Sequence, residues 1–107
     1  MTTFQLPNLS TNPKIRLAYI INNKQYTFSF QWLENFCLLS IYIIKDNKKL
    51  YLIKGRALTA NTDLIARVKD PSLIKGTLTI KNKYAADVEI TQNNLHTDFE
   101  MEYYDEQ

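Results

Sequence analysis

The chain has little of three residue types on which many catalytic sites depend. It contains two glycines, Gly55 and Gly76, among 107 residues, which leaves little material for a phosphate-binding loop. Cys37 is the only cysteine, so no intrachain disulfide can form, and its apolar neighbours predict a buried, unreactive thiol. His96 is the only histidine, and a structural zinc site usually needs four Cys or His ligands. A zinc site therefore has almost no support, and His96 is interpreted as a surface turn residue.

Long apolar runs are also missing. The longest stretch, Phe36–Ile44, contains Ser40 and is far shorter than the roughly 20 residues that a membrane helix needs. The first residues, MTTFQLPNLSTNPK, show no basic region followed by an apolar segment, so no signal peptide is visible. These observations predict a soluble protein made in a reducing cytoplasm, with no membrane partner.

The composition is that of a folded chain, with 45% hydrophobic and 22% charged residues. Its length predicts a single β domain over residues 14–107, preceded by an extended N-terminal arm over residues 1–13 that carries Pro7 and Pro13. Charge is unevenly distributed: residues 1–56 hold eight Lys/Arg and two Asp/Glu, whereas residues 57–107 hold five and nine. The two halves either neutralise each other across the fold, which we favour, or form two differently charged surfaces that stack with neighbours.

Alternation of apolar and polar residues predicts strands, because successive side chains of a strand point to opposite faces. Tyr26, Phe28, Phe30 and Trp32 alternate with Thr27, Ser29 and Gln31, and Asn22-Asn23 suits a tight turn before them. The run 36–45 is apolar on both sides, which favours a strand covered on both faces. The expected strands are 15–21, 25–32, 36–45, 50–54, 77–81, 88–91 and 98–104. Helical turns are expected near 62–67 and from Asp70 to Lys75.

The predicted fold class is therefore all-β: a small antiparallel β-sandwich or barrel with at most one or two short helical turns. In the last strand, Phe99, Met101 and Tyr103 form the face opposite Glu100, Glu102 and Tyr104.

No catalytic constellation emerges. Asp98, Glu100 and Glu102 are spaced at two residues on one strand face, a spacing that also suits a pair of glycosidase carboxylates. Any solvated acidic strand gives the same spacing, so the solvated face is the better interpretation. The chain is predicted not to be an enzyme and to need no cofactor and no metal.

The aromatic face of strand 25–32, near Lys24, Lys45, Lys48 and Lys49, is typical of barrels that stack single-stranded nucleic acid. The alternative is that this face lies in the core, because each buried side chain of this size contributes roughly 1.5–3 kcal/mol. Core placement is favoured, and nucleic acid is an unlikely partner. Trp32→Ala should then cost about 3–5 kcal/mol.

The order of these features resembles the plug proteins of phage contractile-tail baseplates, known from cyanophage. The resemblance depends on short segments spread over nearly the whole chain: Trp32, 36–44, 46–49, Gly55-Arg56, Asp63-Leu64-Ile65, Gly76-Thr77-Leu78 and Asn94-Leu95 through Tyr103-Tyr104.

This resemblance implies a structural virion protein that helps close the tail tube and bridges hub, tube or spike proteins, as a homo-oligomer in the assembled tail. It would be made in the host cytoplasm. Alternatives are a single-stranded nucleic-acid-binding β-barrel and a small phage protein that inhibits a host factor.

Two segments are candidate partner-binding regions, because exposed backbone can add to a neighbour's sheet. One is the arm with Phe4 and Leu6, for which terminal disorder is the alternative. The other is the last strand, with Phe99, Met101, Tyr103 and Tyr104. Arg56 and Asp63 are candidates for polar groups that fix the Gly-Arg loop; as a surface ion pair they would contribute ~0–1 kcal/mol.

Overall fold

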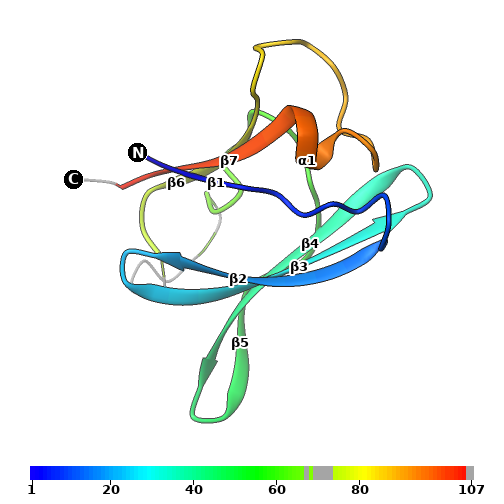
Figure 1. Cartoon of the computed structure of the whole chain (residues 1–107). Helices are drawn as coiled ribbons and strands as arrows, with labels where there is room; N and C mark the ends of the chain where they lie inside the picture. Colours follow the sequence, from blue (N-terminus) through cyan, green and yellow to red (C-terminus); the bar gives the residue numbers. More distant parts are fainter. Residues whose placement is uncertain (67, 69–73, 106–107) are drawn as a thin grey trace.

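The computed structural model describes residues 1–66, 68 and 74–105, and its strands form two facing antiparallel sheets (Figure 1). The larger sheet has the order β2-β3-β4-β5, with β2 Lys14–Ile21, β3 Lys24–Leu33, β4 Phe36–Lys45 and β5 Lys48–Ala57. The smaller sheet has the order β1-β7-β6, with β1 Thr2–Phe4, β6 Thr77–Asn82 and β7 Phe99–Tyr104. One helical turn, α1 (Leu95–Asp98), precedes β7. The all-β prediction is confirmed, in its sandwich form.

The larger sheet is a meander whose turns follow from asparagine and aspartate. Asn22 and Asn23 have φ of 52° and 65°, and Asp46 and Asn47 have φ of 55° and 62°. Two-residue hairpin turns of the favoured hand need positive φ at both central positions, which Asn and Asp tolerate better than most residues. The predicted Asn-Asn turn is therefore confirmed, and the two turns set the register of their hairpins.

The aromatic face of β3 lies in the core between the sheets, as predicted. Tyr26 is 2% exposed, and Phe28 and Phe30 are fully buried. Phe28 makes an edge contact with Tyr19 from β2, with ring centroids 4.9 Å apart. Trp32 is the exception: it lies near the end of β3 and is only partly buried, and its Nε1–H donates to the carbonyl of Glu34 at 3.1 Å.

The smaller sheet covers this core with the apolar face of β7. Phe99, Met101 and Tyr103 are at most 3% exposed, and Ile80 of β6 is fully buried beside them. Leu9, from the segment that joins β1 to β2, is also fully buried. The predicted division of β7 into an apolar and an acidic face is confirmed.

Three local predictions are wrong. Residues 88–91 form no strand: the side chain of Asn94 donates to the carbonyl of Glu89 at 2.9 Å and accepts from the Thr91 amide at 2.7 Å. These side-chain bonds satisfy backbone groups that a strand would pair. Asp98 ends α1 and does not share a strand face with Glu100 and Glu102.

The third error concerns β4, whose far face is exposed at both ends of the strand and buried only at Tyr42. Cys37, Leu39 and Ile41 are buried, whereas Phe36 and Ile44 are 41% and 61% exposed. A continuous apolar run does not show whether a second layer covers the far face, and the small sheet covers only one side.

Both predicted helical turns fall in the chain between β5 and β6. Near 62–67, residues 64–66 form a turn, with the Val68 amide donating to the Ile65 carbonyl at 3.1 Å, and among the described residues the α-helical turn is α1. The turn predicted from Asp70 to Lys75 lies largely outside the described residues.

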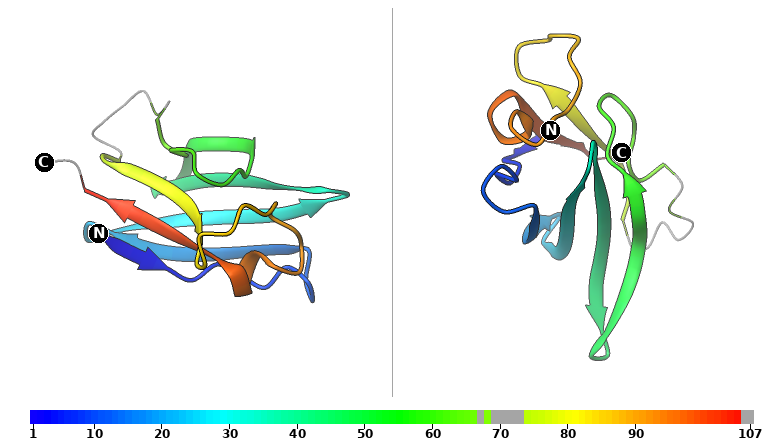
Figure 2. Two further views of the ribbon diagram at one scale, coloured as in Figure 1. Left: turned by 90° about the horizontal axis from the view of Figure 1, so that it is seen from above. Right: turned by 90° about the vertical axis from the view of Figure 1, so that its right-hand side faces the viewer.

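A bulge bends β5 against β4. The paired register shifts on either side of Ile41, and Gly55, with φ of 64°, donates its amide to the Ser40 hydroxyl at 2.9 Å. A glycine in the left-handed region is a common centre of such bulges, which increase the local twist. The hairpin of β4 and β5 consequently turns away from the rest of the molecule, as Figure 1 and the right view of Figure 2 show.

Candidate functional site

The N-terminal segment packs on the protein's own body. β1 pairs with β7 through Thr2↔Tyr103, Thr3↔Glu102 and Phe4↔Met101. Phe4 is half-buried, with its ring 5.4 Å from that of Tyr19, and Leu6 is 5% exposed. Binding of a partner through Phe4 and Leu6 stays a prediction, and it would require β1 to leave its own sheet.

β7 is the middle strand of the smaller sheet, paired with β1 on one side and β6 on the other. This corrects the expectation of a free edge at the last strand. Phe99, Met101 and Tyr103 point into the core, so Tyr104, at 46% exposed, is the one of the four candidates on β7 that faces solvent. Sequence order could not reveal this arrangement, because the covering strand comes from the other end of the chain.

Arg56 and Asp63 each bind backbone groups. The Arg56 guanidinium donates to the Leu64 carbonyl at 2.9 Å. Asp63 accepts from the amides of Ile65 at 3.2 Å and Leu78 at 3.0 Å, which fastens the loop after β5 to β6. The two side chains therefore contact the same loop, yet the bonds they make are not with each other.

The Tyr103 hydroxyl connects the two sheets. It accepts from the Asn22 side chain, in the β2–β3 turn, at 2.9 Å and donates to the Lys75 carbonyl. Burial raises the pKa of Tyr103, the charge of Asp105 adds to this, and the bond from Asn22 opposes it. The Tyr103 hydroxyl therefore links the β2–β3 turn to the chain that precedes β6.

The single cysteine and the single histidine are not arranged for nucleophilic chemistry. Cys37 is 1% exposed, and burial raises the pKa of its thiol from 9.0 to about 11. Such a thiol is protonated at neutral pH and weakly nucleophilic. His96 lies in α1, with a buried Nδ1 that has no hydrogen-bond partner. Within the described residues, no group of three or more His, Cys, Asp or Glu side chains could hold a metal ion.

The surface that sequence analysis missed is the end of the β4–β5 hairpin, residues 43–51, which we call the hairpin tip. Its exposed apolar side chains are Ile44 at 61%, Leu50 at 38% and Tyr51 at 37%. Its charged residues are Lys45, Asp46, Lys48 and Lys49. The register places Ile44 and Tyr51 on one face of the ribbon and Leu50 on the other, so both faces of the tip carry exposed apolar side chains. Exposed apolar surface of this kind marks a candidate contact site. The sequence gives no signal for it, because β3 and β4 are both ten residues long and the sequence does not show that their pairing stops at Thr27↔Tyr42.

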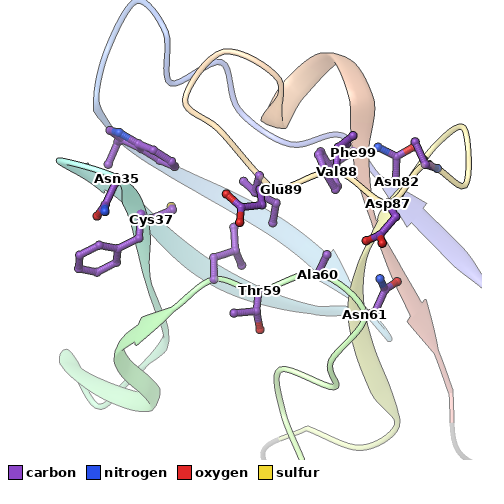
Figure 3. A pocket seen from close by; sticks show the side chains of 15 residues that line it. Asn35, Cys37, Thr59, Ala60, Asn61, Asn82, Asp87, Val88, Glu89 and Phe99 are labelled. Carbon is purple, nitrogen blue, oxygen red and sulfur yellow. Dashed lines mark hydrogen bonds between the residues drawn. The ribbon is translucent and has the colours of Figure 1, made fainter.

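A second feature is an open cleft at the other end of β4, which we call the end cleft (Figure 3). It has a volume of about 360 Å³ and is bounded by the β3–β4 turn, the chain after β5 and the loop at 86–90. Its apolar wall includes Trp32, Leu58 and Val88. Asp87 and Glu89 are the charged residues that line it, and Figure 3 shows both carboxylates turned towards the space.

The geometry defines a small β-sandwich with a filled apolar core, an exposed hairpin tip and an open end cleft. The chain matches the family model described as "Cyanophage baseplate Pam3 plug gp18" over residues 1–106. No curated protein matches it. The chain therefore belongs to the cyanophage baseplate plug family.

Membership fixes the broad biological setting. Proteins of this family are structural components of the phage baseplate, so the chain has a structural role in the virion and assembles with other baseplate proteins. The resemblance on which the prediction depended is thereby confirmed. None of the helices in the described part of the chain has the length and apolar character required to cross a membrane.

Proposed function

We propose that this protein is a non-catalytic plug subunit that helps close the tail tube at the baseplate and bridges neighbouring hub, tube or spike proteins. The observation that carries the proposal is the family match, which extends over residues 1–106 and so includes every described strand. It would be made in the host cytoplasm and act in the assembled tail, as one of several identical copies.

The architecture supports a plugging role physically. The sandwich measures 36 × 30 × 21 Å, and its fully buried residues are all apolar, with no buried polar or charged side chain among those described. A filled core of this kind resists deformation, because protein interiors are packed as densely as organic crystals. The body can therefore block a channel, while the exposed hairpin tip is free to contact a neighbour.

Specific bridging needs interfaces of roughly 800 Å² per partner. The candidate contact residues on the exposed surface are those of the hairpin tip and Tyr104. Phe4 and Leu6 would join them if β1 were exchanged between molecules, a low-cost route to association between identical chains.

The structure disfavours the nucleic-acid alternative at the surface first considered for it. Bases stack on exposed aromatic faces, and Tyr26, Phe28 and Phe30 are at most 2% exposed. The aromatic face of β3 therefore packs inside the core, where bases cannot stack on it.

The decisive experiment is a comparison of tails from phage with and without this gene, by cryo-electron microscopy. The proposal expects density for the protein on the tail axis at the baseplate, lost in the deletion and restored when the protein is supplied from a plasmid. Nuclease treatment should leave the density unchanged. Absence of the protein from purified wild-type tails, or density far from the axis, would contradict the proposal.

A further inference from the structure

The hairpin tip is a projecting ribbon with open edges. The pairing of β3 with β4 begins at Thr27↔Tyr42, whereas the pairing of β4 with β5 continues to Lys45↔Lys48. Pairing with β3 thus stops before the last residues of β4, so the tip leaves β3 as a two-stranded ribbon, and it stands apart from the body in Figure 1 and in the right view of Figure 2. A two-stranded ribbon is only marginally stable alone in water. Contact with a partner would cover its unpaired backbone edges and its exposed apolar side chains.

The tip is basic as well as apolar. It carries three lysines, Lys45, Lys48 and Lys49, and one acid, Asp46. All four side chains are exposed. The Lys49 ammonium lies 4.9 Å from the ring centroid of Tyr42, which holds part of this charge on the outer face of the sheet. The surface that suits the tip is therefore one with carboxylates beside apolar side chains.

The end cleft has this chemistry. Its charged lining residues, Asp87 and Glu89, are both acidic and exposed, and Val88 between them is an apolar side chain that is 49% exposed. Trp32 and Leu58 line the space beneath. At about 360 Å³ the cleft is close to the smallest ligand pockets, roughly 300 Å³. It can take one or two side chains of a turn, while the remainder of the tip covers the loop around it.

The tip and the end cleft lie at opposite ends of the same strand. β4 begins at Phe36, which lines the cleft, and ends at Lys45, in the tip. Ten residues of strand span roughly 33 Å, comparable with the longest dimension of the molecule, 36 Å. The tip therefore cannot reach the cleft of its own chain. A second copy can bring the two together.

We propose that the hairpin tip of one copy docks into the end cleft of a second copy of this chain. Lys45, Lys48 and Lys49 approach the carboxylates of Asp87 and Glu89, and the exposed Ile44, with Tyr51 on the same face of the ribbon, packs against Val88 and its apolar neighbours. Because the two patches differ, the contact is head-to-tail, and repetition closes a ring or extends a column. The inference rests on the proposed function, since it names the contact by which plug subunits assemble.

The test is charge reversal on the full-length chain, followed by sedimentation equilibrium at concentrations up to the millimolar range. The wild-type chain is expected to associate. The tip variant Lys48→Glu/Lys49→Glu and the cleft variant Asp87→Lys/Glu89→Lys should each lose roughly a hundredfold or more in association constant, because each places like charges together. An equimolar mixture of the two should associate again, since the reversed tip then meets a reversed cleft.

Two controls separate docking from general effects of charge and from misfolding. Lys14→Glu/Lys75→Glu makes the same charge change at exposed lysines outside the tip and should leave association unchanged. Recovery in the mixture requires both variants to be folded, so it excludes unfolding as the cause of the loss.

A wild-type chain that stays monomeric at millimolar concentration, or a mixture that does not recover association, would overturn the docking proposal. So would a tip variant that sediments like the wild type yet is lost from tails, because the tip would then bind a different baseplate protein. The proposed function is judged separately: axial density in tails supports it whether or not the tip and cleft meet, and absence from tails contradicts it even if the isolated chain forms rings.

Discussion

Individual side chains on the aromatic face of β3 differ in depth, and their substitutions should differ accordingly. Phe28→Ala is expected to lower the free energy of unfolding by about 3–5 kcal/mol, because Phe28 is fully buried between the sheets. Trp32→Ala should cost less, roughly 1–3 kcal/mol, since Trp32 is partly exposed at the cleft. Urea unfolding measures both. The larger loss first expected for Trp32 assumed full burial; equal losses would show that the cleft is closed over the indole in solution.

The two glycines should respond differently to alanine. A Cβ at Gly76 would lie 2.2 Å from the Tyr104 carbonyl oxygen, so β6 and β7 would have to separate. Gly76→Ala should therefore cost roughly 3 kcal/mol or more, from overpacking and backbone strain together.

Gly55 provides the matched comparison, because a Cβ there meets nothing within 4 Å and only its φ of +64° is unfavourable. Gly55→Ala should cost about 1–2 kcal/mol, and Gly55→Asn less than that, since asparagine tolerates this region. Thermal or urea unfolding ranks the three variants. A Gly76→Ala protein as stable as Gly55→Ala would contradict the close approach of β6 to β7.

Stability should fall at alkaline pH because two buried acids resist ionisation. Burial raises the pKa of Tyr19 from 10.0 to about 12 and that of Cys37 from 9.0 to about 11. Above the lower values the unfolded chain releases protons that the folded chain retains, so the free energy of unfolding decreases as pH rises. The loss should occur between about pH 9 and pH 12, with no contribution from these groups below pH 9.

Urea titrations across this range measure the effect, and Tyr19→Phe and Cys37→Ser identify each contribution. Tyr19→Phe should flatten the slope between about pH 10 and pH 12, although it also removes the 2.7 Å bond from the hydroxyl to the Gln5 carbonyl. If the free energy of unfolding depends on pH in the same way in both variants as in the wild type, the loss of stability at alkaline pH comes from other groups.

At the scale of elements, the loop after β5 depends on Asp63. Asp63→Ala should cost about 1–3 kcal/mol, because the amides of Ile65 and Leu78 lose their acceptor. Asp63→Asn keeps an acceptor oxygen and should cost less. Hydrogen exchange at the Leu78 amide reports the bond directly; equal exchange in the wild type and in Asp63→Ala would show that the carboxylate does not protect this amide.

The elements that sequence could predict are those with local causes. The hairpins of the larger sheet follow from alternation and from Asn22-Asn23 and Asp46-Asn47, which lie close to the residues that they pair. The strand predicted at residues 88–91 was wrong because their alternation of apolar and polar side chains is the same as that of a strand. What decided their structure was the side chain of Asn94, which satisfies their backbone groups.

At the scale of the whole molecule, exposure was the property that sequence could not supply. Met101 and Tyr103 were placed on one face correctly, but their burial depends on the four-stranded sheet that faces them, and the edges of β7 are paired by β1 and β6 from other parts of the chain. Ile44 and Leu50 were predicted within strands, yet nothing local shows that those strands extend beyond the reach of the smaller sheet. The candidate contact surface therefore had to be found in the structure.

Salt should weaken association between copies if the tip meets the cleft. Exposed charges separated by more than about 8–10 Å are largely screened at physiological salt, and closer pairs are weakened as salt rises further. The sedimentation association constant of the wild type should thus fall between low salt and molar salt. A constant that rises with salt would indicate a contact dominated by apolar burial, in which the lysines have little part.

The central position of β7 has a consequence for synthesis. β1 and β6 flank this strand, and it is the last of the three to be synthesised. Until then the nascent chain can form the four-stranded meander, but the inner face of that meander has no complete cover. Phe28 and Phe30 are covered only after β7 has been synthesised, so a chain truncated before residue 99 would leave the apolar face of the meander exposed to water and prone to aggregation.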